Sequence, residues 1–316
     1  MGSDTLQQPD PVTNWPALPL AGWADTAATL HMWTQIVGKI RLALCPLVNH
    51  WWQVPLYVGV RGLSTSAMPY QDRALDIEFD FLDHNLAIRD SRGAAKFVPL
   101  YARSVADFHR EFMAVLHSIG IDVKIWPKPV EVPDPIPFAD DVIHASYDPE
   151  AVSRFHRILL RASAVIQQFR AEFLGKASPV NFFWGGFDLA LGLYSGRRAP
   201  EREGADAMVR EAYSHECIDV GFWPGSGALA DPAFYAYAWP EPSGYPTSPV
   251  RPASAFYHPE LKEFILMYDD VRRAPSPERT LLDFFESAFD AGANLANWDR
   301  AMVRRPLGLK TGSGSR

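Results

Sequence analysis

The sequence contains only two cysteines, Cys45 and Cys217, among its 316 residues, and they stand far apart in the chain. So few cysteines exclude a disulfide framework and a cysteine-rich zinc site. Both thiols are expected to behave as small buried groups in a reducing compartment. The sequence therefore predicts a cytoplasmic protein.

Blocks of Lys and Arg are also missing, and the net charge is −7. Proteins that bind nucleic acid usually carry a basic stripe that displaces phosphate counterions, so DNA and RNA are not expected partners. No apolar run approaches the length of a membrane span, and the polar segment 1–13 lacks the apolar core of a signal peptide. No membrane partner is expected either.

Three sequence patterns of well-known enzyme classes are absent: the Walker P-loop, the G-x-G-x-x-G turn after a strand, and the G-x-S-x-G elbow. These patterns position phosphates, dinucleotides and nucleophilic serines respectively. Their absence disfavours nucleotide-dependent enzymes of those kinds and serine hydrolases. It leaves the cofactor unknown, with a divalent metal as one candidate and no nucleotide or flavin pattern.

The residues that are present form the patterns of an α+β fold. Hydrophobic residues make up 47% of the chain, enough for a sizeable core. Helical spacing predicts helices over Asp25–Ala43 and Val105–Ile119, and Asp148 followed by Pro149 predicts the start of another that continues to about residue 175. A closing helix is expected over 281–296. Alternating or β-prone runs predict strands at 54–60, 75–82, 86–89, 123–126, 180–183, 189–194, 217–223, 234–239 and 263–268.

The two halves of the sequence resemble each other. Asn49–Pro69 aligns with Val180–Pro200 without a gap, and Asp76–Leu82 aligns with Cys217–Trp223. This correspondence predicts a degenerate internal duplication of a helix–strands–helix unit, with mainly antiparallel sheet and a ligand-binding cleft between the halves. The alternative is that two α+β halves share these patterns by coincidence. The predicted parts are a first half at 14–126, a proline-rich connector at 127–147, a second half at 148–303 and a flexible tail at 304–316.

Several short motifs occur together along the chain. W-P-x-L-P begins at Trp15, T-L-H-x-W-x-Q-x-V-G-K at Thr29, and N-H-W-W at Asn49. F-F-W-G-x-F-D-L-A, S-G-R-x-A-P, S-H-E and G-F-W-P-G follow between residues 182 and 225. In combination they resemble a bacterial family whose domain has no known function. The resemblance covers about residues 15–300 and implies no activity, so the candidate residues are interpreted from their own chemistry.

The first predicted helix carries a narrow polar face. His31, Gln35 and Lys39 recur every four residues, away from the apolar stripe of the same helix. One interpretation is a polar strip lining a pocket, in which Lys39 binds an anion and His31 acts as an acid or a base. The alternative is a solvated helix face.

Two further histidines come from separate stretches of the sequence. His50 lies beside Trp52 at the entrance to the first strands, where an aromatic ring could stack on a planar or sugar-like ligand. His215 and Glu216 follow an insertion that the first half lacks, and loops often carry sites. His50, His215 and Glu216 would together suffice as a small metal site, although the spacing of a known metal motif is absent.

An isolated carboxylate, Asp188, stands in the apolar segment after Trp184. A buried carboxylate needs a partner, and Arg197 is the expected one, either as a structural ion pair or as a pair that anchors substrate. Trp223 belongs to the G-F-W-P-G turn, which is expected to shape a wall beside the site; the alternative is a tight turn that ends a strand.

The sequence thus favours a small-molecule enzyme, a hydrolase or lyase with or without a metal. The expected catalytic residues are His31, His50, His215 and Glu216. The expected substrate contacts are Gln35, Lys39, Trp52, Trp184, Asp188, Arg197 and Trp223. Two alternatives stay open: a non-catalytic protein that binds a small molecule in an aromatic cleft, and a structural module. The sequence leaves the oligomeric state open.

Overall fold

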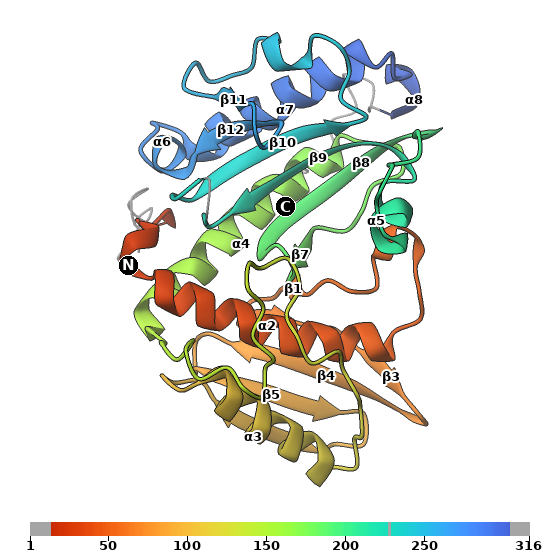
Figure 1. Ribbon diagram of the computed structural model, residues 1–316. Coiled ribbons are helices and arrows are strands. Elements are labelled where there is room, and N and C mark those ends of the chain that lie inside the picture. The colour runs from red at the N-terminus through yellow and green to blue at the C-terminus, as the bar shows by residue number, and fades with distance from the viewer. Residues whose placement is uncertain (1–13, 227–228, 304–316) are drawn as a thin grey trace, which may run out of the picture.

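The computed structural model describes residues 14–226 and 229–303. Helices and antiparallel sheets are combined, which confirms the α+β class (Figure 1). The predicted tail at 304–316 and the polar segment 1–13 lie outside the described residues. None of the described helices has both the length and the apolar character needed to cross a membrane.

Sheet 1 is an antiparallel sheet formed by residues 57–99. Its strand order is β1-β2-β4-β5-β6, and β3 also pairs with β4. The strands are β1 (Tyr57–Val58), β2 (Gly62–Ser64), β3 (Met68–Tyr70), β4 (Arg73–Asp80), β5 (Asn85–Asp90) and β6 (Ala95–Pro99). Two helices pack against each other beside it, α2 (Ala24–Leu44) and α3 (Val105–Ser118).

Sheet 2 is a larger antiparallel sheet with the strand order β11-β12-β10-β9-β8-β7. Its strands are β7 (Asn181–Phe183), β8 (Asp188–Arg198), β9 (His215–Trp223), β10 (Ala233–Trp239), β11 (Phe256–His258) and β12 (Glu263–Met267). Two long helices, α4 (Pro149–Ala171) and α7 (Pro277–Leu295), pack against its central strands and against each other. Three short helices complete this part: α5 (Ala207–Ala212), α6 (Tyr268–Arg272) and α8 (Arg300–Val303).

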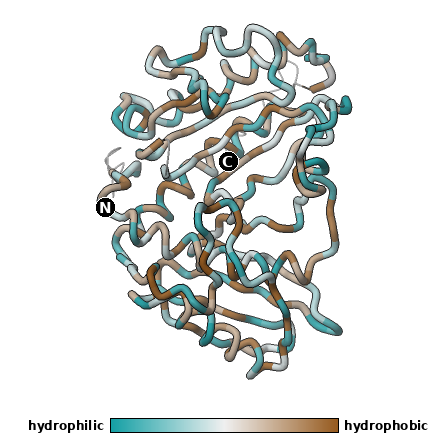
Figure 2. The backbone as a smooth tube through the Cα atoms, viewed as in Figure 1, coloured by the Kyte–Doolittle hydropathy of each residue, from teal (hydrophilic) through white to brown (hydrophobic). Residues whose placement is uncertain are grey.

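Leu56 and Phe182 connect the two sheets. Each backbone N–H donates to the carbonyl of the other residue, at 2.9 Å and 2.8 Å. Most buried side chains of both sheets belong to one hydrophobic core that reaches from Trp15 to Val303, while Ala190, Ala233, Tyr235 and Ile265 form a second, smaller cluster on sheet 2. Figure 2 shows brown, hydrophobic residues recurring along the helices and strands that meet in this interior.

Most predicted elements occur near their predicted bounds. Asp148 caps α4 by accepting hydrogen bonds from the backbone of Glu150 and Ala151, with Pro149 in the first turn. Helix α2 begins one residue before Asp25, which lies in its first turn and is not the N-cap. Three 3₁₀ turns, η1 (Leu20–Gly22), η2 (Asn49–Trp51) and η3 (Tyr245–Thr247), occur in the connections.

Two strand predictions were wrong in whole or in part. Residues 123–126 form no strand, because Val123 and Ile125 pack against the core from an irregular segment that leads into the prolines. The predicted strand at 54–60 shortens to Tyr57–Val58, since Pro55 has no N–H to donate and Gly59 already turns back to bond Gly62.

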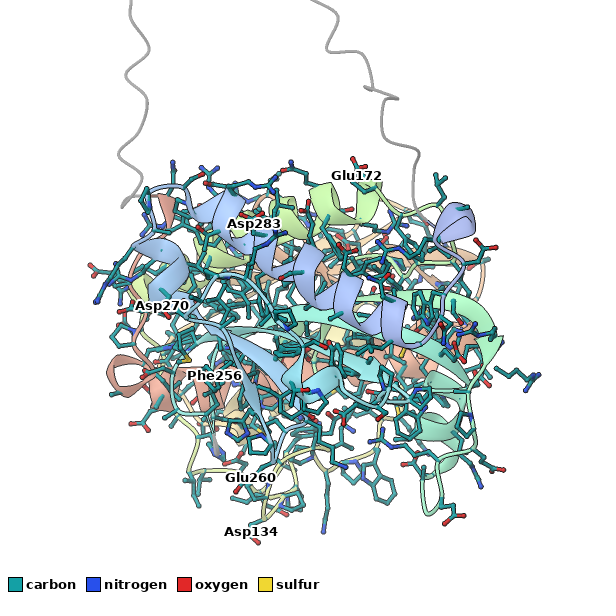
Figure 3. The ribbon with its side chains drawn as sticks, turned by 90° about the horizontal axis from the view of Figure 1, so that it is seen from above. Asp134, Glu172, Phe256, Glu260, Asp270 and Asp283 are labelled. Atoms are coloured by element: carbon teal, nitrogen blue, oxygen red, sulfur yellow. The ribbon has the colours of Figure 1, made fainter. Side chains whose placement is uncertain are left out.

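The two faces of sheet 2 differ in character. On β8, Leu189, Leu191 and Leu193 are buried toward α4 and α7, while the alternate residues point to the other side. Figure 3 shows Asp134 and Glu260 on one side of the molecule, and Glu172 and Asp283 of the helix layer on the opposite side. One face of sheet 2 is therefore covered by helices, and the other is available to form a site.

The contact between Gly38 of α2 and Trp184 gives the first testable prediction. A Cβ atom at Gly38 would lie 2.2 Å from the buried indole of Trp184, whose Nε1 donates to the Val54 carbonyl at 2.7 Å. Gly38→Ala should lower the free energy of unfolding by about 1–3 kcal/mol, measured by urea denaturation. Gly22→Ala is the matched control, because a Cβ there has nothing within 4 Å. Equal stability of the two variants would contradict the close packing.

Candidate functional site

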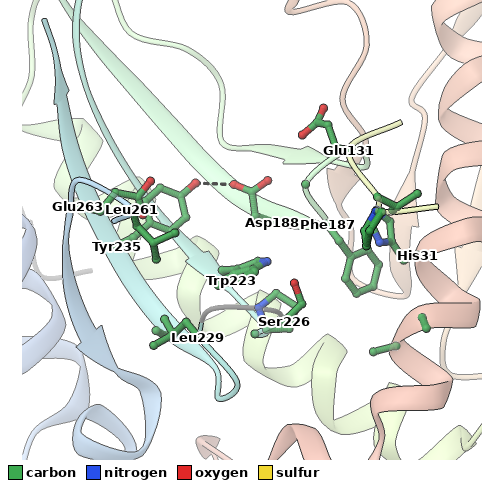
Figure 4. Close-up of a pocket in the computed structure, with 18 of the residues that line it drawn as sticks. His31, Glu131, Phe187, Asp188, Trp223, Ser226, Leu229, Tyr235, Leu261 and Glu263 are labelled. Carbon is green, nitrogen blue, oxygen red and sulfur yellow. Dashed lines mark hydrogen bonds between the residues drawn. The ribbon is translucent and has the colours of Figure 1, made fainter. Parts of the chain in front are cut away.

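A hollow with a volume of about 890 Å³ lies over the uncovered face of sheet 2 (Figure 4). Its walls come from the first half of α2, from residues 129–136 of the proline-rich segment, and from β8, β9, β10 and β12. Trp223 and Trp239 contribute indole rings, and Tyr213, Tyr235 and Tyr237 contribute phenols. A cavity of this size, with aromatic walls and a few polar groups, is typical of a small-molecule site.

Glycines on the strands make room for polar side chains on the uncovered face of sheet 2. Gly221 of β9 lies opposite Tyr235 of β10, and a Cβ at Gly221 would be 2.3 Å from the Tyr235 hydroxyl. Gly192 of β8 lies opposite Asp219 of β9, and a Cβ there would be 2.9 Å from Asp219 Oδ1. Larger residues at these two glycines would fill the space that the hydroxyl and the carboxyl occupy.

Asp188, the first residue of β8, contributes a carboxyl to the lining of the pocket. The Tyr235 hydroxyl donates to its Oδ2 at 2.5 Å (Figure 4). Burial, together with the nearby Glu131 and Asp219 carboxyls, raises the pKa of Asp188 to about 7. A carboxyl with a pKa near neutrality is able both to give and to take a proton at physiological pH.

Glu131 approaches Asp188 from the opposite wall. Its Oε2 would be 3.6 Å from a Cβ at Gly186, and Asp188 Oδ1 would be 2.9 Å from the same point. Desolvation and the neighbouring Asp206 carboxyl raise the pKa of Glu131 above its ordinary value, although its side chain is partly exposed. Two carboxyls with elevated pKa values therefore flank Gly186.

Two more carboxyls stand on the same face of sheet 2. Burial raises the pKa of Asp219 to about 6, and the Tyr237 hydroxyl donates to its Oδ2 at 2.8 Å. Burial and the neighbouring Asp188 and Asp219 raise the pKa of Glu263 to about 8. Across residues 14–226 and 229–303, no Lys, Arg or His forms an ion pair with any of these four carboxyls. The site thus gathers four carboxyls, none of which has an ion-pair partner among the described residues.

His31 reaches the pocket from α2. Its ring stacks on Phe187 with 5.0 Å between centroids, and its Nε2 is 2.8 Å from the Gly185 carbonyl oxygen. Since that carbonyl only accepts, Nε2 carries the hydrogen. Burial lowers the pKa of His31 to about 4, so the imidazole is neutral at pH 7. His31 is therefore a neutral wall of the pocket whose one N–H is bonded to Gly185.

The other residues of the predicted polar helix face are buried and have structural contacts. Gln35 exchanges two hydrogen bonds of 2.8 Å with the backbone of Val130. Lys39 lies 5.4 Å from the ring centroid of Trp184, and burial lowers its pKa to about 8. Gln35, Lys39 and Trp184 do not line the pocket, whereas His31, Asp188 and Trp223 do.

The expected Asp188–Arg197 pair is wrong. Arg197 forms an ion pair with Glu216 at 2.7 Å and donates to the carbonyls of Ala296 and Asn297 just after α7. Asp188 instead accepts from Tyr235. The two side chains lie at opposite ends of β8, and a strand of this length separates them by far more than an ion-pair distance.

His50, His215 and Glu216 do not converge as a metal-ligand set. The His50 and His215 rings lie 5.4 Å apart and Trp52 lies beside them, outside the pocket lining. Glu216 is held by Arg197 and by the Ser195 hydroxyl at 2.9 Å. Within the described residues no group of three or more His, Cys, Asp or Glu side chains is arranged to hold a metal ion.

The sequence interpretation missed Glu131, Asp219, Tyr235, Tyr237 and Glu263. A signal for the strand residues was present in the alternation of β8, β9 and β10, where leucine, valine and phenylalanine alternate with aspartate, glycine and tyrosine. Glu131 comes from an irregular segment, and no strand or helix periodicity marks it.

Comparison with known proteins gives a family and no activity. No curated protein and no solved structure matches the chain. The model of a family of unknown function (DUF5996) matches residues 15–305, nearly the whole length, which confirms the resemblance that the motifs predicted. The chain therefore belongs to this family of unknown function (DUF5996).

Proposed function

We propose that the pocket over sheet 2 is the active site of a small-molecule enzyme in which carboxyl groups perform acid–base catalysis. The observation that carries this proposal is the carboxyl of Asp188, which lines a large cavity, accepts from Tyr235 and has a pKa of about 7. Catalytic acids and bases need pKa values near the working pH. Hydrolysis and elimination are the reaction classes that such a group serves without further help.

The arrangement supports a division of roles between two carboxyls. Asp188 accepts the Tyr235 hydrogen bond, which favours its ionised form. By contrast, no side chain or backbone group of the described residues donates a hydrogen bond to Glu131, whose pKa is raised. Both flank Gly186, whose missing side chain leaves the space between them open. One carboxyl would remove a proton from the substrate or from water while the other, still protonated, donates to the leaving group.

The charge of the pocket favours a substrate with a positively charged nitrogen. Six carboxyl side chains line it, against two cations, Arg202 and Lys262. Arg202 already lies over the rings of Tyr213 and Trp239, at 4.9 Å and 4.8 Å from their centroids. An amine between aromatic faces and buried carboxylates would gain cation–π and ionic stabilisation.

A binding protein without catalysis is the second candidate. His50, His215 and Glu216 lie outside the pocket lining, and His31 is neutral and fixed by a carbonyl. An aromatic cavity whose predicted catalytic groups are dispersed is what a non-catalytic binder would have. Turnover, measured as described below, separates the two candidates.

We also propose that the fold arose by the internal duplication predicted from the sequence, with the pocket in the cleft between the halves. The order of elements supports this: α2, the strands β2-β4-β5-β6 and α3 are followed by α4, the strands β8-β9-β10-β12 and α7. In each set the strands form an antiparallel meander and the two helices contact each other. The pocket takes its walls from α2 of the first set and from the sheet of the second.

The preference for a cation can be tested with tyramine and its neutral analogue tyrosol, which carries a hydroxyl in place of the amine. Because buried carboxylates stabilise the ammonium group, tyramine should bind at least about tenfold more tightly than tyrosol, which corresponds to about 1.4 kcal/mol. Isothermal titration calorimetry at pH 8 measures both. Glu263→Gln should reduce the preference, and Asp140→Asn, an exposed carboxyl outside the pocket lining, should leave it unchanged. Equal affinity for the two probes would exclude an amine substrate.

Catalysis by Asp188 can be tested with a library of amine-bearing esters, amides and ethers, with products identified by mass spectrometry. Asp188→Asn removes the titrating group but keeps the size of the side chain. Turnover of any compound that reacts should fall by about 10²–10⁴-fold in this variant. Wild-type turnover should follow a pH profile with an inflection near pH 7, which Asp140→Asn retains. Binding of library members without any conversion would favour the non-catalytic candidate.

The raised pKa of Asp188 also predicts how stability depends on pH. The folded protein keeps this carboxyl protonated up to about pH 7, whereas the unfolded chain ionises it at its ordinary pKa of 3.8. Unfolding therefore releases a proton in this window, and stability falls as the pH rises from about 4 to 7. Asp188→Asn should remove about 2–3 kcal/mol of the decline between pH 5 and pH 8, measured by urea denaturation at these two pH values. An unchanged difference between the two pH values would show that Asp188 titrates normally.

A further inference from the structure

A second group of ionisable side chains lies outside the pocket lining, where η2 and α5 meet the far ends of β8 and β9. Lys176 follows α4, His50 belongs to η2, and His215 begins β9. These nitrogen bases come from three separate stretches of chain. The acid–base chemistry proposed above uses none of them.

A chain of hydrogen bonds fixes the protonation state of this group. The Nδ1 of His50 lies 2.9 Å from the Ala212 carbonyl oxygen, which only accepts, so Nδ1 carries the hydrogen. The other ring nitrogen, Nε2, is then an acceptor and receives a hydrogen bond from Lys176 Nζ at 2.6 Å. The Lys176 ammonium is thereby aimed at an imidazole, and no carboxylate forms an ion pair with it among the residues described.

Aromatic rings surround the ammonium group. Lys176 Nζ lies 5.4 Å from the ring centroid of Trp52 and 5.3 Å from that of Tyr194. The His215 ring meets the His50 ring edge-on at 5.4 Å, and its Nδ1 lies 3.0 Å from the Ser214 hydroxyl oxygen. The other ring nitrogen of His215, Nε2, forms no hydrogen bond with the residues that the structure describes.

The charges of this group repel one another. Burial and the neighbouring Lys176 lower the pKa values of His50 and His215, and Arg198 lowers that of His215 further. Glu211 faces the same group and acts in the opposite direction on all three bases. With both imidazoles neutral, Lys176 and Arg198 together exceed the charge of Glu211 by one. An added anion would relieve this repulsion and favour protonation of the imidazoles.

The backbone of η2 is strained where it presents His50. His50 and Trp51 have φ values of 58° and 61°, so two consecutive residues with side chains adopt the left-handed conformation. This conformation is unfavourable for residues with side chains and persists where the surrounding structure holds it. His50, which the fold holds in this conformation, is also the residue whose Nε2 accepts a hydrogen bond from Lys176.

We propose that Lys176, His50 and His215 form a binding site for the phosphate group of a ligand, distinct from the acidic pocket. A phosphate carries two negative charges near neutral pH and has several acceptor oxygens. It can accept from the Lys176 ammonium and from protonated His215, and also from His50 once Nε2 is protonated and the hydrogen bond from Lys176 to that nitrogen is released. The half-buried Trp52 ring lies beside the ammonium group and would contact the rest of the ligand.

Titration with inorganic phosphate tests this proposal, with sodium chloride added to hold the ionic strength constant. In NMR spectra the imidazole signals of His50 and His215 should shift with one saturating curve, and both pKa values should rise in the bound state. Acetate, a monoanion, should bind several-fold more weakly. Absence of a saturating shift at both histidines overturns the proposal, and equal binding of acetate overturns the assignment to phosphate.

Variants supply the second arm of the test. Lys176→Met keeps the length of the side chain without its charge and should weaken phosphate binding at least about tenfold, whereas Lys176→Arg should restore most of it. Lys96→Met, at an exposed position on β6, is the matched control and should bind like the wild type. Circular dichroism checks that each variant is folded. Loss of affinity equal in Lys96→Met and Lys176→Met would show a general charge effect and contradict a site at Lys176.

Discussion

Sheet 2 separates two environments, and the alternation of side chains along its strands has to serve both. On the helix side, Leu189, Leu191 and Leu193 of β8 belong to the continuous core under α4 and α7. Asp188 and Gly192 of the same strand lie on the other face of the sheet, the face that borders the pocket. Because successive residues of a strand point to opposite faces, a slip of one residue would place carboxyls in the core and leucines in the pocket. Packing of the core therefore fixes the position of every polar group on the other face.

Within the described chain, no positively charged side chain forms an ion pair with the carboxyls on that face. Burying an ionised carboxylate without a partner costs several kcal/mol, and a protein limits this cost by raising the pKa so that the group stays protonated. Asp188, Asp219 and Glu263 all show such raised values. The hydroxyls of Tyr235 and Tyr237 stabilise what charge remains by donating to two of them. The core supplies the stability that allows this local disadvantage to persist, as is typical of functional sites.

Much of the fold could be predicted from the sequence, because long periodic segments decide it. The helix after Asp148-Pro149 and the hairpin of β4 and β5 follow from an N-cap signal and from period-two alternation, both of which act locally. The site could be predicted only in part. The sequence marks Asp188 as a candidate because it is a carboxylate in an apolar run. Proximity in the sequence predicted Arg197 as its partner, whereas strand pairing places Tyr235 beside it. Which side chains meet across a sheet depends on register, and a single sequence does not contain the register.

Gln35 shows how a buried polar side chain that touches no ligand can still determine a site. Its amide forms two hydrogen bonds with the backbone of Val130, so it pairs with the irregular segment much as a neighbouring strand would. The next residue, Glu131, has a φ of 57°, a conformation that is unfavourable for a residue with a side chain. With Val130 held on one side and prolines restricting the chain beyond, this backbone cannot relax without breaking both bonds to Gln35. Gln35 thus keeps the Glu131 carboxyl beside Gly186, opposite Asp188, although the glutamine itself is outside the pocket.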